Sequence, residues 1–482
     1  MLASQPAWPR SSKGAPLTSN SFPLWELRAA TLTDMTTGVV VFTRDLRVHD
    51  HPALAAAIRE HSAVVPLFVF DDAVERADFR AANRTAFMLE SLADLDSSLQ
   101  SRGAALIYRN GNWAEEVIGI AEEVGATAIH LSEDVSGFAS RRLAQLTERS
   151  KPSGIRVQTH PGVMVISPGD VLPTGGDHFK VFTPYYRKWL ALPWRAPIAA
   201  PKEIASIHGL DARSITKIED LSSGALSPNR ATGGEGIARR VFASWRENHL
   251  HEYESIHNDL PGDSTSHLAP YIHFGCLSPL ELAKSALGRD GAEAWVRQLC
   301  WRDFYHQALA ARPDASWADF KHRGDHWIDD PAALQAWKEG RTGFPVVDAG
   351  MRQLKEEGFM HNRTRMIVAS FLTKDLGIDW RHGARHFLEW LTDGDIANNN
   401  LNWQWTAGTG TDTNPNRIFN PTVQGQRFDP KGEYVRRYVK ELASIEDGSI
   451  HTLGPLERAA LGYPDPIVDH HEAIAEYRLR RA

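Results

Sequence analysis

The densest group of polar side chains lies near the end of the chain, in the motif TDGDIANNNLNWQW at residues 392–405. Aspartate, asparagine and glycine favour neither helices nor strands, so this run indicates amide and carboxylate groups that bind a polar ligand. A calcium loop is the alternative, but the spacing D-x-D-x-x-N lacks the glycine and the final glutamate of an EF-hand. The motif therefore predicts a ligand site, and we expect no metal ion among the functional residues.

A second motif, WVRQLCWRDFY at residues 295–305, combines an amide, an indole and a guanidinium. Spacings of three, four and seven residues place four of its members on one side of a helix: Gln298, Trp301, Arg302 and Tyr305. Such a side suits a stacked and hydrogen-bonded base. An ordinary amphipathic helix with a buried tryptophan is the alternative.

A third motif, at residues 263–275, places small hydroxyl residues before a helix start that contains proline. Hydroxyl groups and free backbone amides at a helix start favour a phosphate. Clusters of serine and threonine also serve simply as N-caps, so this motif alone does not decide between the two.

The elements that would position these motifs differ between the two halves of the chain. Five apolar, β-branched runs alternate with helical patterns, at residues 38–43, 64–70, 104–109, 126–131 and 155–160. They predict a parallel, doubly wound α/β sheet, with a ligand pocket where residues 43–50 and 132–137 follow their strands. No dinucleotide-binding G-x-G-x-x-G follows the first strand and no P-loop motif occurs, which argues against an NAD-binding unit or a P-loop ATPase.

One helix of this half is marked by apolar residues at spacings of four, three and four: Met88, Leu92, Leu95 and Leu99. We expect its charged residues to face solvent: Arg84, Glu90, Asp94 and Asp96. Beyond residue 236 the strand pattern ends, and Ser278-Pro-Leu-Glu281 and Asp330-Pro331 mark helix starts. The sequence thus predicts a disordered extension at residues 1–36, an α/β domain at 37–166, an inter-domain linker at 167–236 and an all-α domain at 237–475.

The composition sets further limits. With 42% hydrophobic and 23% charged residues among 482, the chain is neither disordered nor fibrous. Two cysteines, Cys276 and Cys300, indicate a reducing, cytoplasmic setting, and no apolar run is long enough to span a membrane. We expect a monomer. The net charge of -7 does not exclude nucleic acid, because residues 362–440 carry eleven lysines and arginines against eight acidic residues.

Together with RDLRVHD at 44–50, VFTPYYRKW at 181–189, TSHLAP at 265–270 and GFMHNRTRM at 358–366, these motifs resemble the photolyase and cryptochrome family. The resemblance runs in order from about Gly38 to His471. It implies a light-driven DNA repair enzyme, a lyase of the class I cyclobutane pyrimidine dimer branch. In that family FAD lies in the helical domain and passes an electron to a pyrimidine dimer flipped from the duplex. A second, antenna chromophore, methenyl-folate or a deazaflavin, is also implied.

The resemblance assigns cofactor-binding positions. Residues 265–269 and Tyr253 would hold the phosphates and the ribityl chain, Asp393 in ion pair with Arg365 would face the flavin, and Asn399 would lie beside flavin N5. The full set is Tyr253, Thr265, Ser266, His267, Leu268, Ala269, Trp295, Arg302, Arg365, Asp393, Gly394, Asp395 and Asn399.

It also assigns positions for damaged DNA and for electron transfer. Trp301 and Trp405 would stack against the dimer, within a set of Gln298, Trp301, Arg302, Tyr305, Asn362, Arg363, Met366, Trp405 and Gln424. Trp403, Trp380 and Trp327 would form a chain that carries electrons from the surface to oxidised flavin.

Several positions depart from the family pattern. His267 and Ala269 stand where an arginine and a serine are usual, which predicts weaker binding of FAD. Gln298 replaces the glutamate of cyclobutane-dimer enzymes and is typical of (6-4) photoproduct repair, but that branch also has a histidine pair where this chain has Asn362 and Met366. Repair of cyclobutane dimers is therefore favoured, with (6-4) repair and a cryptochrome-type photoreceptor as alternatives. Asn399 with the Trp301 and Trp405 pair favours repair over light sensing.

Overall fold

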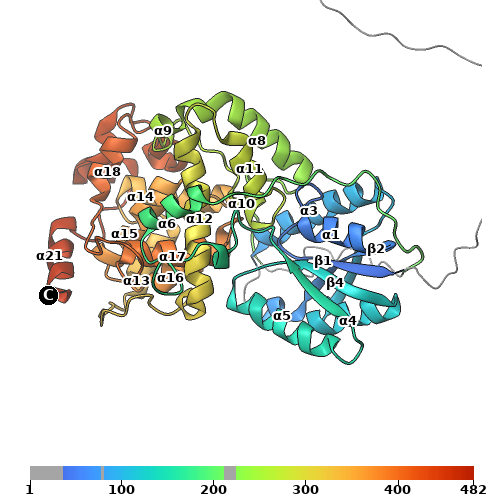
Figure 1. The fold of residues 1–482 in the computed structure, drawn as a ribbon. Coiled ribbons are helices and arrows are strands. Elements are labelled where there is room, and N and C mark those ends of the chain that lie inside the picture. The colour runs from blue at the N-terminus through green and yellow to red at the C-terminus, as the bar shows by residue number, and fades with distance from the viewer. Residues whose placement is uncertain (1–35, 77–80, 211–223, 482) are drawn as a thin grey trace, which may run out of the picture. The chain divides into compact units, whose positions relative to one another are not determined.

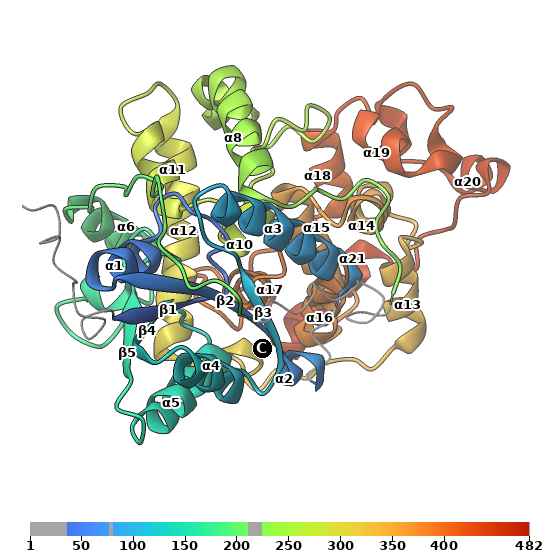
Figure 2. The same cartoon turned by 90° about the vertical axis from the view of Figure 1, so that its right-hand side faces the viewer.

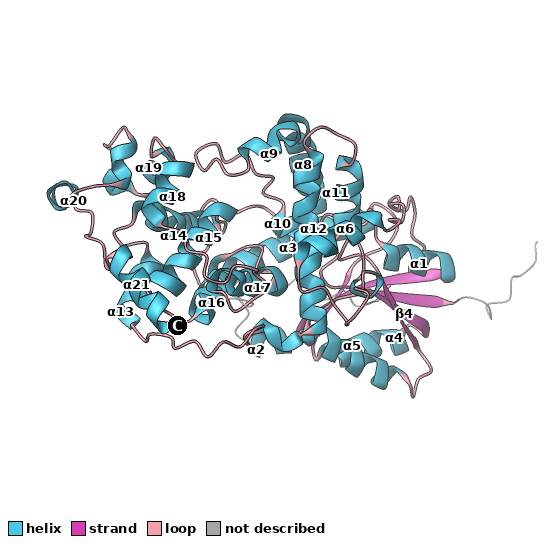
Figure 3. Ribbon diagram, turned by 60° about the vertical axis from the view of Figure 1, so that its left-hand side comes forward, coloured by secondary structure: helices cyan, strands magenta, loops and turns pink. Residues whose placement is uncertain are grey.

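The computed structural model describes residues 36–76, 81–210 and 224–481. A parallel sheet occupies one part of the described chain, and helices make up the rest (Figures 1 and 3). This arrangement confirms the predicted α/β and all-α halves. None of the helices in this part of the chain has the length and the apolar surface needed to cross a lipid bilayer.

The sheet contains five parallel strands in the order β3-β2-β1-β4-β5. They are β1 (Thr37–Phe42), β2 (Ala63–Asp71), β3 (Ile107–Gly111), β4 (Ala126–Ser132) and β5 (Arg156–His160). Each lies at a predicted run, although β3 begins three residues later than expected. Every residue of β1 and β2 is buried, as near-continuous apolar strands covered on both faces should be.

The two faces of the sheet pack against different helices (Figure 2). Val40 and Phe42 of β1 belong to the core that contains α3 (Ala82–Gln100), whereas Val39 and Val41 belong to the core of α4 (Trp113–Glu123). This alternation follows from the two-residue repeat of a strand. The remaining helices of the α/β unit are α1 (Pro52–Glu60), α2 (Asp72–Arg76) and α5 (Gly137–Ser150).

The segment predicted as an inter-domain linker contains helical structure. The expected linker contains a short 3-10 turn (Pro168–Asp170) and helix α6 (Phe182–Ala191), whose Tyr185 and Trp189 are fully buried. Helix α6 packs against α12 (Ala292–Ala311), so these residues form part of the helical core.

Two helix starts follow the predicted capping. The Ser278 hydroxyl accepts from the backbone N–H of Glu281, and Asp330 accepts from that of Ala333. The other helices in chain order are α8 (Glu235–His249), α9 (Tyr253–Ile256), α10 (Ala269–His273), α11 (Pro279–Ala286), α13 (Pro331–Glu339), α14 (Pro345–Glu357), α15 (Asn362–Ser370), α16 (Trp380–Trp390), α17 (Ile396–Ala407), α18 (Pro421–Phe428), α19 (Glu433–Tyr438), α20 (Pro455–Leu461) and α21 (His470–Arg480). Short 3-10 turns cover Leu250–Glu252, Pro313–Ser316, Lys440–Leu442 and Gly448–His451, and a π-helical turn covers Phe371–Asp375.

The charged side chains of α3 were expected to face solvent, and this prediction is wrong. Arg84 donates to the carbonyl groups of Leu388 and Leu391. The other three charged side chains, which are acidic, also have partners. Glu90 pairs with Arg230, Asp94 accepts from the N–H of Gly236 and Asp96 accepts from the N–H of Leu106. The contacts of Arg84, Glu90 and Asp94 fasten α3 to segments at least 140 residues away in the sequence, which no local pattern reveals.

The loop that follows β1 contacts the helical unit. Arg47 is 1% exposed, and its guanidinium donates to the carbonyl groups of Gly275, Gly162, Asp50 and His49. Five donors in a fixed fork suit this set of acceptors. A single buried side chain thus joins the loop after β1 to the turn after α10.

We predict that Arg47→Met lowers the free energy of unfolding by about 2 to 4 kcal/mol, because buried carbonyl groups lose their donor. Urea unfolding of the whole chain measures the change. Arg149→Gln is the matched control, since Arg149 is half exposed and pairs with a half-exposed Glu115. Equal stability of Arg47→Met and the parent would show that the loop is held by other contacts.

Candidate functional site

A cavity of about 480 Å³ lies within the helical unit, in the size range of small-molecule sites. Its walls come from the loop before α10 and from α10, α12, α15, α16 and α17. Most of the residues predicted from the sequence line it: Tyr253, Thr265, Ser266, His267, Leu268, Ala269, Trp295, Gln298, Trp301, Arg302, Tyr305, Asn362, Arg365, Met366, Asp393, Asp395, Asn399, Trp403 and Trp405. The three motifs therefore meet at one place.

Five predicted residues lie outside the cavity wall. Gly394 faces Arg84, because a Cβ at this position would lie 2.7 Å from Arg84 Nη1. Arg363 donates to Asn258 Oδ1 and lies over the ring of Phe428. The other three are Gln424 on α18, Trp380, which is fully buried, and Trp327, which is partly buried against the core that contains Trp380 and Trp403.

Asp395 is the N-cap of α17 and supplies a buried carboxyl group to the cavity wall. Its Oδ1 accepts from the backbone N–H of Asn398, while its Oδ2 lies 3.0 Å from Arg44 Nη1. Nitrogen atoms of His306 and His273 lie 3.4 and 3.6 Å from the same oxygen. Burial alone would raise the pKa of Asp395, but these neighbours hold it well below its usual value. The cavity therefore contains a permanent buried anion.

A second carboxylate in the same turn forms the ion pair implied by the family resemblance. Arg365 Nη1 lies 3.1 Å from Asp393 Oδ2, and Arg365 Nε donates to the carbonyl of Met360. Because the guanidinium is fixed at both ends, Asp393 is held in a single orientation toward the cavity.

Asn399 points its side-chain amide along α17 and α16. The Nδ2 group donates to the carbonyl of Ala384 at 3.0 Å and to Asn400 Oδ1 at 2.9 Å. With both N–H groups engaged, the side-chain oxygen is left to accept from a group in the cavity. A carboxylate at this position would instead face two acceptor atoms.

The loop at residues 263–269 has an unusual backbone. Asp263 and His267 both adopt positive φ, at 46° and 51°, and their side chains join through His267 Nε2 and Asp263 Oδ1 at 2.8 Å. Burial alone would lower the pKa of His267, but the hydrogen bond and charge of Asp263 raise it. The pair with Asp263 thus favours the protonated form of His267, at a position where the sequence suggested that a cation was lost.

Two polar atoms in the cavity wall fit a bound polar ligand. Thr265 Oγ1 and Arg302 Nη2 are buried and have no hydrogen-bond partner among the described residues. Arg302 Nη1 donates to the carbonyl of Val163, so its other N–H groups are turned toward the cavity. Buried donors without partners are rare in folded proteins, and phosphate or ribityl oxygen atoms would satisfy them.

Aromatic rings form the other walls. Trp301 stacks on Phe182 with ring centroids 3.6 Å apart and planes 3° from parallel, so one face of its indole is covered. Arg417 lies over Trp405 at 5.3 Å. Trp403 is 3% exposed and packs edge to face on Phe387, with ring centroids 5.0 Å apart.

Sequence reasoning missed several residues of this site. His273 lines the cavity, His306 reaches the buried Asp395, and the ring of Phe359 lies tilted against that of His267 with centroids 4.3 Å apart. His306 follows the second motif directly and lies one helical turn after Arg302, which is the signal that could have indicated it.

The sequence matches two family models, described as DNA photolyase over residues 38–202 and as the FAD binding domain of DNA photolyase over residues 295–481. The chain therefore belongs to the photolyase and cryptochrome family. The second match identifies FAD as its cofactor, in agreement with the unpaired donors of the cavity.

Relatives of known name extend over nearly the whole chain. Deoxyribodipyrimidine photo-lyase of Streptomyces griseus is 51% identical over 454 residues, which cover 93% of this chain and 99% of the relative. A class III photolyase structure from Agrobacterium tumefaciens superposes with a TM-score of 0.86 and 30% identity, covering 94% of this chain and 98% of that one. An archaeal photolyase structure from Sulfolobus tokodaii with two FAD molecules superposes with a TM-score of 0.81 and 28% identity. The match covers 92% of this chain and 99% of that one.

We predict that FAD is retained less well as the pH rises above roughly 6.5, the ordinary pKa of histidine. The pKa of His267 is raised, so its positive charge persists to a higher pH than usual and is lost as the pH passes through that raised value. His267→Arg should remove the pH dependence, because arginine stays charged. Flavin released during dialysis at a series of pH values measures the effect.

The control variant for this prediction is His251→Gln, which changes an exposed histidine outside the cavity wall. Identical pH profiles for the parent and His267→Arg would show that His267 does not act on the bound cofactor.

Proposed function

We propose that this chain repairs cyclobutane pyrimidine dimers in DNA in a light-dependent reaction, as a class I photolyase. One observation carries the proposal: the residues expected around the flavin and the tryptophan pair expected around the lesion line the same cavity. FAD, when bound and reduced, supplies a light-excited electron donor. The class I assignment is supported by the order and identity of the sequence motifs.

The cofactor end of the cavity consists of groups with complementary chemistry. Thr265, Arg302 and His267 offer donors to phosphate and ribityl oxygens. Asn399 would offer its amide oxygen to the flavin ring and would contribute no charge there, since its Nδ2 group is engaged by Ala384 and Asn400. A carboxylate a few ångströms from a reduced anionic ring would oppose it, so the amide favours the reduced cofactor.

At the lesion end, Trp301 and Trp405 would stack against an extruded dimer. Base stacking on an aromatic ring is worth roughly 1 to 3 kcal/mol, which offsets the few kcal/mol needed to unstack a damaged base. Phe182 covers one face of Trp301, so the dimer would meet the other face. Gln298, Asn362 and Met366 line the same cavity and would contact the lesion.

Binding of damaged DNA would also draw on charge. Residues 362–440 carry a local excess of lysine and arginine, although the chain as a whole is acidic. Arg363 and Gln424, which lie outside the cavity wall, would contact the DNA backbone.

Three further proposals concern the oligomeric state, the cellular compartment and the antenna chromophore. The protein would be a monomer in the cytoplasm, and its two cysteines, Cys276 and Cys300, are buried and free in agreement with this. Methenyl-folate or a deazaflavin would serve as antenna in the α/β unit. Mass spectrometry of the released chromophores tests the last proposal directly.

Substrate choice tests the proposed function. We expect illuminated, reduced protein to restore an oligonucleotide with one cyclobutane thymine dimer, and to leave a (6-4) photoproduct unrepaired. Gln298→Glu should raise dimer repair modestly, because a carboxylate accepts more strongly from the imide N–H than an amide does. Chromatography of the digested DNA, with a sample kept in the dark, measures repair. Efficient (6-4) repair would overturn the substrate, and no repair at all would indicate a photoreceptor.

Trp403→Phe separates electron supply from repair. Phenylalanine keeps most of the apolar volume at this buried site, but it is far harder to oxidise than indole. We expect the variant to fail in the photoreduction of oxidised FAD with an external donor, followed by absorbance. Repair should persist once the flavin is reduced with dithionite, because the repair electron does not use the tryptophan chain of Trp403, Trp380 and Trp327.

Trp337→Phe is the matched control, since Trp337 is fully buried and contacts Trp403 with ring centroids 6.0 Å apart. It lies outside the proposed chain and should photoreduce normally. Normal photoreduction in Trp403→Phe would show that this indole is not part of the electron-transfer path. Loss of its repair after dithionite would show that Trp403 supports the site itself.

A further inference from the structure

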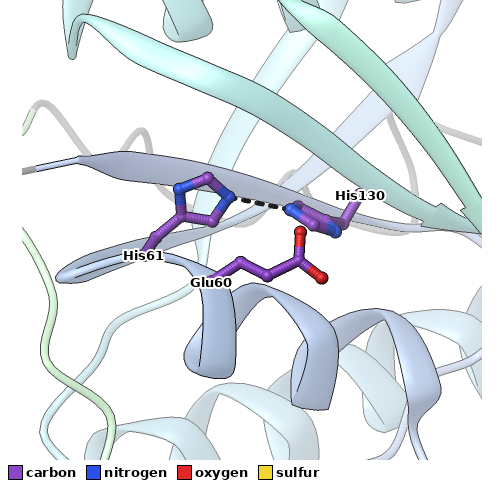
Figure 4. A group of neighbouring side chains, drawn as sticks. All are labelled: Glu60, His61 and His130. Carbon is purple, nitrogen blue, oxygen red and sulfur yellow. Dashed lines mark hydrogen bonds between the residues drawn. The ribbon is translucent and has the colours of Figure 1, made fainter.

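Three side chains that bind metals in other proteins meet beside the sheet, away from the flavin cavity (Figure 4). Glu60 ends α1, His61 follows it directly, and His130 lies within β4. One ligand atom from each lies within 4.8 Å of the other two. None of the three lines the cavity described above.

The ring nitrogens of the two histidines converge. His61 Nε2 lies 3.0 Å from His130 Nε2, and each second ring nitrogen faces another partner. His130 Nδ1 lies 3.0 Å from His160 Nε2, and His61 Nδ1 lies 3.4 Å from Thr127 Oγ1. Histidines that bind a metal usually hold their other nitrogen in an outer hydrogen bond of this kind.

The surrounding backbone leaves room for this arrangement. A Cβ at Gly38 would lie 2.4 Å from Cδ2 of His61, so the imidazole can lie over β1 only because this position is glycine. His130 is fully buried, whereas the Glu60 side chain is 31% exposed. The carboxylate therefore stands between the buried nitrogens and solvent, where an ion would enter.

Basic side chains also lie near the cluster. The competing cations are Arg156, whose charge acts on both imidazoles, and Arg59, which pairs with Glu60. The side chain of Arg59 is 70% exposed, so that ion pair is weak and readily replaced.

We propose that Glu60, His61 and His130 form a binding site for a divalent transition-metal ion, with zinc as the favoured occupant. Two imidazoles and one carboxylate are a ligand set that zinc accepts, with the fourth position left to water. Magnesium and calcium prefer oxygen ligands throughout and are disfavoured here. His160 is a positioning residue, because it fixes the tautomer of His130. An ion at this site would join the end of α1 to β4.

The alternative is that the three histidines satisfy one another as a hydrogen-bonded chain without an ion. Metal binding by the untagged full chain with FAD bound distinguishes the two. After treatment with a chelator, the protein is dialysed against zinc chloride, and its zinc content and zinc titration heat are measured. We expect one equivalent of zinc per chain and no uptake of magnesium.

Substitutions within the cluster test whether the zinc ion binds at these residues. Glu60→Gln and His61→Gln should lose this equivalent, and His160→Gln should bind about 10- to 100-fold more weakly. Glu252→Gln and His251→Gln are matched controls, because these residues form an exposed histidine–carboxylate contact of 3.3 Å. Both controls should bind zinc as the parent does.

Two results would overturn the proposal: no zinc uptake by the parent, or uptake that Glu60→Gln and His61→Gln leave unchanged. Circular dichroism checks that each variant is folded. Cobalt added to the parent gives a second measurement that needs no variant, because cobalt bound by two nitrogens and a carboxylate in four-coordinate geometry absorbs visible light. Absence of that absorption would also overturn the proposal.

Discussion

The contact between the two halves of the structure depends on the buried carboxylate of Asp395. A charge removed from water must be matched by partners, and these come from both halves of the chain. Arg44, from the loop after β1, bridges Asp395 and Asp134, with N–O distances of 3.0 and 2.8 Å. The same carboxylate caps α17, the helix that carries Asn399 and Trp403 into the cavity. The floor of the cofactor site is thus assembled across the contact between the sheet and the helices, and neither half completes it alone.

The aromatic wall of the cavity also depends on residues from two separate parts of the chain. Trp301 belongs to α12, but the ring that holds it flat, Phe182, belongs to α6, in residues that looked like a connection. Stacking at 3.6 Å fixes the indole before any base arrives, so less side-chain freedom is lost on binding. The segment between the two halves therefore shapes the site as well as joining its parts.

Local patterns were enough to predict much of this molecule. The five strands follow from short apolar runs, the starts of α11 and α13 follow from Ser278 and Asp330, and the three motifs did meet in one cavity. The failures share a cause, which is that a partner lies far away in the sequence. Arg84 meets Leu391, 307 residues later, and His61 meets His130, 69 residues later. Nothing next to a charged residue in a sequence shows whether it will face water or a distant carbonyl group.

That separation has a consequence for how the protein is made. Ribosomes add about 5 to 20 residues per second, so a gap of 307 residues takes about 15 to 60 s to synthesise. During that time α3 can form on the growing chain, but the carbonyl groups that Arg84 will bind do not yet exist. The face of α3 that is later buried and the loop after β1 therefore stay exposed to solvent until the last quarter of the polypeptide has emerged. Synthesis of the segment that contains Leu388 and Leu391, rather than folding of the first domain, is then the step that allows these contacts between α3 and the helical unit to form.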